Sequence, residues 1–72
     1  MTQIYTANNS NSLVVEQTIW SGVLKLVKNK DGSFERFYRT HNETKFTKTG
    51  WGKKAKQEFE ILFKQAKQEL AN

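Results

Sequence analysis

The 72-residue chain contains no cysteine, and it has one histidine, His41. Without cysteine there is no disulfide and no thiolate metal site, and one histidine cannot form a metal-binding cluster. No apolar run approaches the roughly 20 residues that a membrane-spanning helix needs, and the N-terminus lacks the charged and apolar segments of a secretion signal. We therefore expect a soluble cytoplasmic protein without metal, cofactor or membrane contact, held together by packing.

The sequence also lacks the patterns of an enzyme. No serine lies in a nucleophile motif, there is no phosphate-loop or dinucleotide-binding fingerprint, and Glu43 is the acid nearest to His41 in the sequence. We therefore predict no catalytic residues and expect a small binding module.

The length allows one small domain, which buries only about 60% of its unfolded surface. Residues 1–12 are polar and rich in asparagine, so we expect a flexible lead-in, in which Ile4 and Tyr5 could add a short edge strand. Residues 13–72 are expected to form the single domain.

Three segments have the composition of β-strands. Residues 13–20, 23–28 and 34–39 are rich in β-branched and aromatic residues. Asp31-Gly32 lies between the second and third of these segments and is typical of a hairpin turn. A further short strand is expected over residues 44–48, with Phe46 pointing inward.

The length of the hairpin loop decides which side chains share a face of the sheet. With a four-residue loop over Asn29–Gly32, Val27 would lie opposite Phe34 and Val23 opposite Tyr38, whereas a shorter loop would shift this register. In that register the other face carries Leu24, Leu26 and Phe37.

From Trp51 onward the apolar residues follow a helical period. The stripe comprises Trp51, Ala55, Phe59, Leu62, Phe63, Ala66 and Leu70. It predicts a helix over about residues 52–70, with Thr49 as the N-cap. The predicted fold is therefore an α+β domain: an antiparallel meander of three or four strands with one C-terminal helix packed on one face.

A single helix leaves the other face of such a sheet open. We expect Phe37 or Tyr38, with Arg36 or Arg39, on this face, where aromatic and basic side chains together could stack nucleic-acid bases or lie in a groove. The same face could instead form a homodimer.

Residues 44–57 hold the densest positive charge of the chain. This segment contains no acid and five lysines: Lys45, Lys48, Lys53, Lys54 and Lys56. Since the N-terminus of a helix carries unpaired N–H groups and partial positive charge, lysines around it favour a phosphate or another anion. Trp51, between two glycines, is interpreted as a core anchor, with base stacking as the alternative, and Trp20 as a core residue.

Residues 23–70 resemble the small three-stranded-sheet-plus-helix DNA-binding domains of the integrase arm-binding and AP2-like kind. Gly50-Trp51 stands where those domains have Gly-Phe ahead of the helix, and Lys48 precedes the glycine. The expected strands carry four basic residues: Lys25, Lys28, Arg36 and Arg39. Lys53 replaces the threonine that caps the helix in those domains, and residues 1–22 have no counterpart.

The resemblance implies a sheet docked in the major groove of DNA, with basic and aromatic strand residues on the backbone and bases. Single-strand binders built of four strands and a helix share the element order.

We therefore hypothesise a nucleic-acid-binding protein, with DNA as the expected partner. Its net charge of +5, from 12 basic and seven acidic residues, agrees with such a partner. The candidate contacts are Lys45, Lys48, Lys53, Lys54, Lys56, Arg36, Arg39, Lys25, Lys28 and Tyr38. The alternative is a protein-interaction module, such as a small inhibitor or adaptor, that docks on an acidic protein surface.

Overall fold

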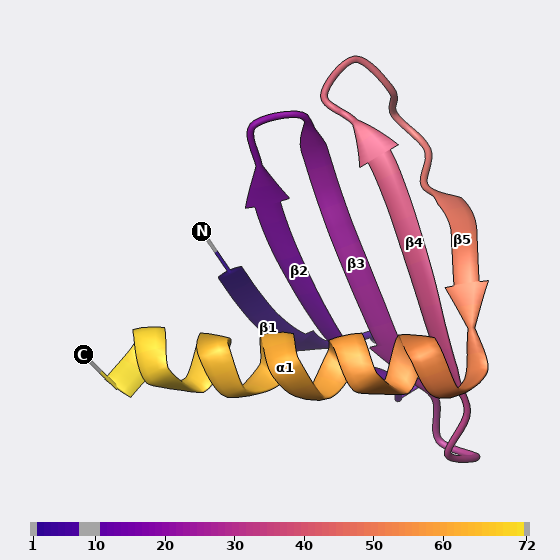
Figure 1. The fold of residues 1–72 in the computed structure, drawn as a ribbon, viewed down its shortest axis with the longest axis vertical. Helices are drawn as coiled ribbons and strands as arrows, with labels where there is room; N and C mark the ends of the chain where they lie inside the picture. The colour runs from indigo at the N-terminus through magenta and orange to yellow at the C-terminus, as the bar shows by residue number, and fades with distance from the viewer. Residues whose placement is uncertain (1, 8–10, 72) are drawn as a thin grey trace.

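The computed structural model describes residues 2–7 and 11–71, and these residues form a five-stranded antiparallel sheet and one helix (Figure 1). The elements in chain order are β1 (Thr2–Thr6), β2 (Leu13–Ile19), β3 (Gly22–Lys28), β4 (Phe34–Thr40), β5 (Thr47–Trp51) and α1 (Gly52–Ala71). Each strand pairs with the one before it, in the order β1-β2-β3-β4-β5. The α+β meander with a C-terminal helix is confirmed, and the sheet has more strands than the predicted three or four.

The additional strand is β1, at the N-terminal edge of the sheet. Ile4 pairs with Val15 of β2 and packs against the core, while the hydroxyl of Tyr5 donates a hydrogen bond to Glu16. Burial, and then Glu16, raises the pKa of Tyr5 above its usual range. The short edge strand that Ile4 and Tyr5 were expected to add is therefore present as β1, and residues 1 and 8–10 of the expected lead-in lie outside the described part of the chain.

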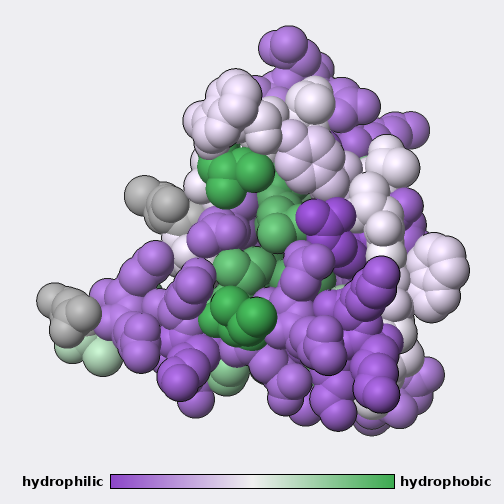
Figure 2. Space-filling model, viewed as in Figure 1, coloured by the Kyte–Doolittle hydropathy of each residue, from purple (hydrophilic) through white to green (hydrophobic). Residues whose placement is uncertain are grey.

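The core lies between the sheet and α1. Phe59 is 4% exposed, and its ring meets the ring of Phe34 edge-on at 5.4 Å and stacks on that of Phe63 at 5.6 Å. The helix buries Ala55, Phe59, Leu62 and Ala66, whose spacing of three and four makes one stripe. Hydrophilic side chains cover most of the outward surface of α1, with a hydrophobic patch over its middle (Figure 2). The helix predicted over residues 52–70 is confirmed.

The β3–β4 hairpin has a longer loop than the four residues considered from the sequence. Lys28 pairs with Phe34, the backbone N–H of Asn29 donates to Ser33, and Gly32 has φ of +90°. A three-residue turn that ends in a positive φ is a common hairpin connection, and here the flanking Asn29 and Ser33 complete a five-residue loop. The register is therefore wrong by one residue: Leu24, not Val23, lies opposite Tyr38.

Strand β5 begins later than predicted. It covers Thr47–Trp51 rather than residues 44–48, so Thr49 lies in a strand and not at the N-cap position. The Thr49 hydroxyl accepts a hydrogen bond from Nη1 of Arg36 at 2.6 Å. Gly52, with φ of +71°, turns the chain from β5 directly into α1.

The helix runs across the strands near the end where the β3–β4 hairpin lies (Figure 1). Phe34 and Arg36 of β4 meet Phe59 and Glu58 of the helix, so they point to the helix side. Because side chains alternate along a strand, the residues between them point the other way. We call this other surface the helix-free face, and its central and β5-side residues are Val23, Lys25, Val27, Glu35, Phe37, Arg39, Lys48 and Trp51. Within the described residues, no helix is both long enough and apolar enough to cross a membrane.

Candidate functional site

Cations lie over aromatic rings on the helix-free face. The ammonium of Lys25 is 4.9 Å from the centroid of the Phe37 ring and 4.2 Å from that of Phe46. The guanidinium carbon of Arg39 is 5.3 Å from the centroid of Phe46. Both distances to Phe46 fall within the roughly 6 Å of a cation–π contact, so two positive charges share one ring.

Strand pairing produces this arrangement. Lys25 of β3 pairs with Phe37 of β4, which in turn pairs with Lys48 of β5. A row of cation, ring and cation thus crosses three neighbouring strands. Phe46, just before β5, lies beside this row rather than in the main core, so the prediction that it points toward the core is wrong.

Lys48 and Glu35 form an ion pair on the same face. The ammonium of Lys48 is 3.0 Å from one carboxylate oxygen of Glu35, and the amide nitrogen of Asn29 donates to the other at 2.8 Å. The Asn29 amide, and then Lys48, holds the pKa of the Glu35 carboxyl below its usual range. At neutral pH the carboxylate therefore offsets part of the positive charge of Lys48.

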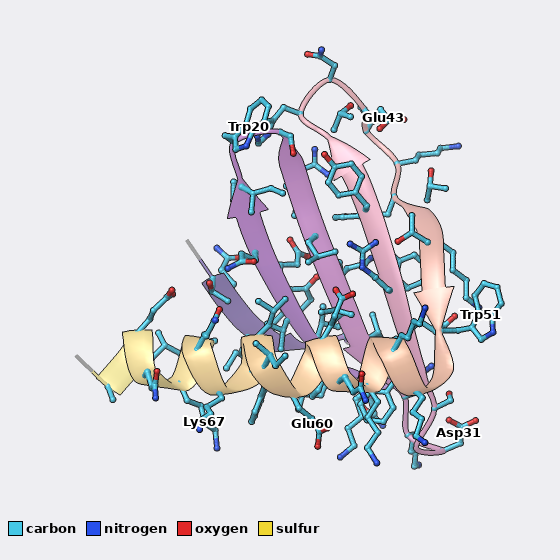
Figure 3. The ribbon with its side chains drawn as sticks, in the orientation of Figure 1. Trp20, Asp31, Glu43, Trp51, Glu60 and Lys67 are labelled. Atoms are coloured by element: carbon cyan, nitrogen blue, oxygen red, sulfur yellow. The ribbon has the colours of Figure 1, made fainter. Side chains whose placement is uncertain are left out.

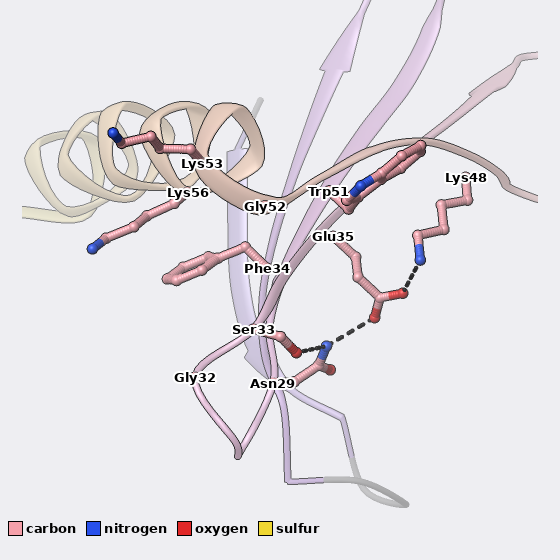
Figure 4. A pocket seen from close by; sticks show the side chains of 10 residues that line it. All are labelled: Asn29, Gly32, Ser33, Phe34, Glu35, Lys48, Trp51, Gly52, Lys53 and Lys56. Carbon is pink, nitrogen blue, oxygen red and sulfur yellow. Dashed lines mark hydrogen bonds and ion pairs between the residues drawn. The ribbon is translucent and has the colours of Figure 1, made fainter.

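A hollow lies where β5 enters the helix, beside the β3–β4 hairpin (Figure 4). Lys48, Lys53 and Lys56 line it together with Trp51 and the ring of Phe34. Figure 4 shows Phe34 pointing toward the helix and Glu35 pointing toward Lys48 on the other side of the strand. The hollow thus joins the helix-free face to the first turn of α1.

The five lysines of residues 44–57 do not meet at one point. Lys48, Lys53 and Lys56 line the hollow at the helix N-terminus. Lys54 instead lines a second depression, on the side of α1 that holds Arg36 and Glu58. Lys45 lies in the β4–β5 loop, at the end of β5 away from the helix. Three of the five lysines are therefore placed around one possible anion.

The basic strand residues are divided between the two faces. Lys25 and Arg39 are on the helix-free face, whereas Arg36 is on the helix side, where its Nε donates to Glu58 at 3.0 Å. Lys28 is also on the helix side, with its ammonium 6.0 Å from the centroid of Phe34. Tyr38 shares that side and donates to the hydroxyl of Ser21 at 2.9 Å. Arg36, Lys28 and Tyr38 are therefore not part of the basic surface on the helix-free face.

Both tryptophans are exposed, contrary to their interpretation as core residues (Figure 3). Trp20 is 94% exposed in the β2–β3 turn, and Trp51 is 71% exposed at the end of β5. The ammonium of Lys48 lies 5.8 Å from the centroid of the Trp51 ring. Because Trp51 pairs with Glu35, it projects from the edge strand on the helix-free face and not into the helical stripe, and it also borders the depression that Lys54 lines.

The residues that sequence reasoning missed at this site are Phe46, as the ring that Lys25 and Arg39 share, and Glu35, as the partner of Lys48. The alternation of side chains along β4 indicates Glu35, because Glu35, Phe37 and Arg39 point to the same face of the strand. The expected strand over residues 44–48 directs Phe46 to the core, whereas the structure places Phe46 in the loop before β5, where strand alternation does not set its direction. Among the described residues, no group of three acids or histidines is placed to hold a metal ion.

The chain matches no protein-family model, no curated protein and no solved structure.

Proposed function

We propose that this protein binds nucleic acid, with DNA as the first partner to test, through the helix-free face of its sheet. The observation that carries the proposal is the pair of cations, Lys25 and Arg39, over the ring of Phe46. Nucleic acid presents phosphates and flat bases at short, regular spacing, so a surface that interleaves cations with rings complements both.

The lysines that line the hollow between β5 and α1 extend this surface. Lys53 and Lys56 are exposed in the first turns of α1, and Lys48 links them to the helix-free face. A phosphate near Gly52 would also be favoured by the partial positive charge of the helix N-terminus. The proposed path of the nucleic-acid backbone therefore runs from Arg39 and Lys25 toward Lys48 and the start of α1.

Salt dependence tests the proposal. We expect the double variant Lys25→Gln and Arg39→Gln to bind a labelled oligonucleotide more weakly. Its salt slope should be lower by about 1.8 with a duplex or about 1.4 with a single strand, because roughly 0.9 or 0.7 counterion is released per phosphate contact. The matched control is Lys30→Gln with Lys64→Gln, which removes the same charge from exposed positions in the hairpin loop and on the helix.

The control is expected to bind nearly as the parent does. Thermal melting of each variant checks that the fold is retained. If the two double variants lost the same affinity and the same slope, the effect would come from net charge, and the proposed face would be wrong.

A protein-interaction module is the second candidate, favoured by the exposure of Trp20. Tryptophan is enriched at the energetic centres of protein interfaces, and Trp20 neighbours Ile19, which is also exposed. Ile19 pairs with Gly22, in phase with Leu24 and Tyr38, so its side chain lies on the helix side of the sheet rather than on the helix-free face. It suits a second copy of the chain, because Trp20 and Ile19 of the two copies could bury one another.

Sedimentation of the parent and of Trp20→Ser tests this candidate. A concentration-dependent dimer that Trp20→Ser abolishes would support it. A parent that stays monomeric at millimolar concentration would exclude self-association through this surface.

A further inference from the structure

Trp51 has the position of a binding residue rather than of a packing residue. It is the last residue of β5, on the edge strand, with 71% of its surface exposed. Leaving so large an apolar side chain in water forgoes the stabilisation that burial would give. Its neighbour Lys48 holds a positive charge 5.8 Å from the ring centroid, where it can reach the phosphate of a base stacked on that ring.

Phe46 provides a second ring at the other end of β5. The five residue steps from Phe46 to Trp51 span roughly 15 Å of extended chain. Lys25 and Arg39 lie over the ring of Phe46, and Lys48 lies, at a longer distance, over the ring of Trp51. The edge of the sheet thus repeats the same combination twice, an aromatic ring with a cation over it.

Rings of this kind can stack only on bases whose faces are free. In a duplex both faces of each interior base are covered by its neighbours, whereas bases of a single strand can turn outward onto aromatic side chains.

We propose that the partner of the helix-free face is an unpaired strand of nucleic acid. Its bases stack on the exposed ring of Trp51, and on Phe46 as Lys25 and Arg39 move from that ring to the phosphates, while Lys48 contacts a further phosphate. This inference rests on the proposed nucleic-acid binding and names the form of the partner.

Fluorescence of Trp51 tests the proposal directly. In a Trp20→Phe background Trp51 is the remaining tryptophan of the chain. We expect a 15-nucleotide oligo-dT to quench its emission on binding, because a base stacked on the indole quenches it. A 15-base-pair duplex should bind at least tenfold more weakly and cause little quenching. Oligo-rU of the same length shows whether the 2′-hydroxyl matters, and stacking on Trp51 is expected with either sugar.

Affinity variants provide the second readout. Removing an aromatic side chain that stacks on a base weakens single-strand binding by about tenfold or more. Trp51→Leu should therefore weaken oligo-dT binding by about tenfold. Trp51→Tyr keeps an aromatic ring and should retain most of the binding. Trp20→Leu is the matched control, because it removes an equally large exposed ring from a different surface.

The outcomes separate the inference from the proposed function. If the duplex bound as tightly as oligo-dT and left Trp51 emission unchanged, nucleic-acid binding would stand and the single-strand inference would be overturned. If the parent bound none of the three oligonucleotides at low salt, the proposed function itself would be wrong. Equal effects of Trp51→Leu and Trp20→Leu would also overturn the role of Trp51.

Discussion

Replacing Phe59 by alanine should remove about half or more of the stability of this domain. Phe59 is 4% exposed and contacts both Phe34 and Phe63, so its loss leaves a cavity with aromatic walls between α1 and the sheet. A buried Phe→Ala change costs about 3–5 kcal/mol, and the two ring contacts place this one toward the upper end. A domain of this length has a total stability of about 4–11 kcal/mol. A loss near 5 kcal/mol leaves the variant with at most about 6 kcal/mol and, at the lower end of the range, unfolded at room temperature.

Urea denaturation followed by circular dichroism at 222 nm measures the effect. With an m-value of about 1 kcal/mol/M, a loss of 4 kcal/mol would lower the midpoint by about 4 M. Ile61→Ala is the control, because Ile61 lies on the same helix but is 58% exposed, and it should cost less than about 0.5 kcal/mol. If the urea midpoint of Phe59→Ala were lowered no more than that of Ile61→Ala, this account of the core would be refuted. Tryptophan emission is a poor probe here, since both tryptophans are already exposed in the folded protein.

Three further outcomes follow from particular contacts. Glu35→Gln should strengthen oligonucleotide binding and raise the salt slope by up to about one, because it frees the charge of Lys48; a titration at several salt concentrations checks this. Asn29 and Lys48 hold the pKa of Glu35 in the folded protein below its unfolded value. The stabilisation that they give the folded state is therefore complete above about pH 4.5 and is lost as the pH falls through the folded pKa, so the free energy of unfolding should change less with acid pH in Glu35→Gln. Gly22→Ala should destabilise by about 1–3 kcal/mol in thermal melting, since an added Cβ would lie 2.1 Å from the backbone oxygen of Arg39; a melting temperature equal to the parent's would contradict that clash.

The sequence predicts β2, β3, β4 and α1 well because each carries a clear period. β-branched residues mark the strands, and the spacing of Ala55, Phe59, Leu62 and Ala66 gives the buried side of the helix. Strand β1 is harder to predict because Ile4 is its main core contact, and one apolar residue defines no period. Its place in the sheet depends on pairing with β2, which is a long-range interaction.

The faces of the sheet are less predictable than its strands. A loop one residue longer than assumed changes the partner of every residue in the hairpin, so Phe37 and Tyr38 exchange places relative to the expected register. The Asp31-Gly32 pair predicts that a turn occurs, but its length also depends on the Asn29–Ser33 backbone pair. The division of basic residues, with Arg39 on the helix-free face and Arg36 on the helix side, follows from this register.

Trp51 shows how one backbone angle separates a core residue from a candidate binding residue. In the sequence, Trp51 is four residues before Ala55 and eight before Phe59, which fits the helical stripe. That phase holds only if the helix continues back through Gly52. Gly52 has φ of +71° instead, so the direction of Trp51 is set by its pairing with Glu35 in β4. The two glycines beside Trp51 are therefore the informative signal: a residue between them belongs to the junction of strand and helix, and its side chain is free to leave the core for the surface where Lys48 lies.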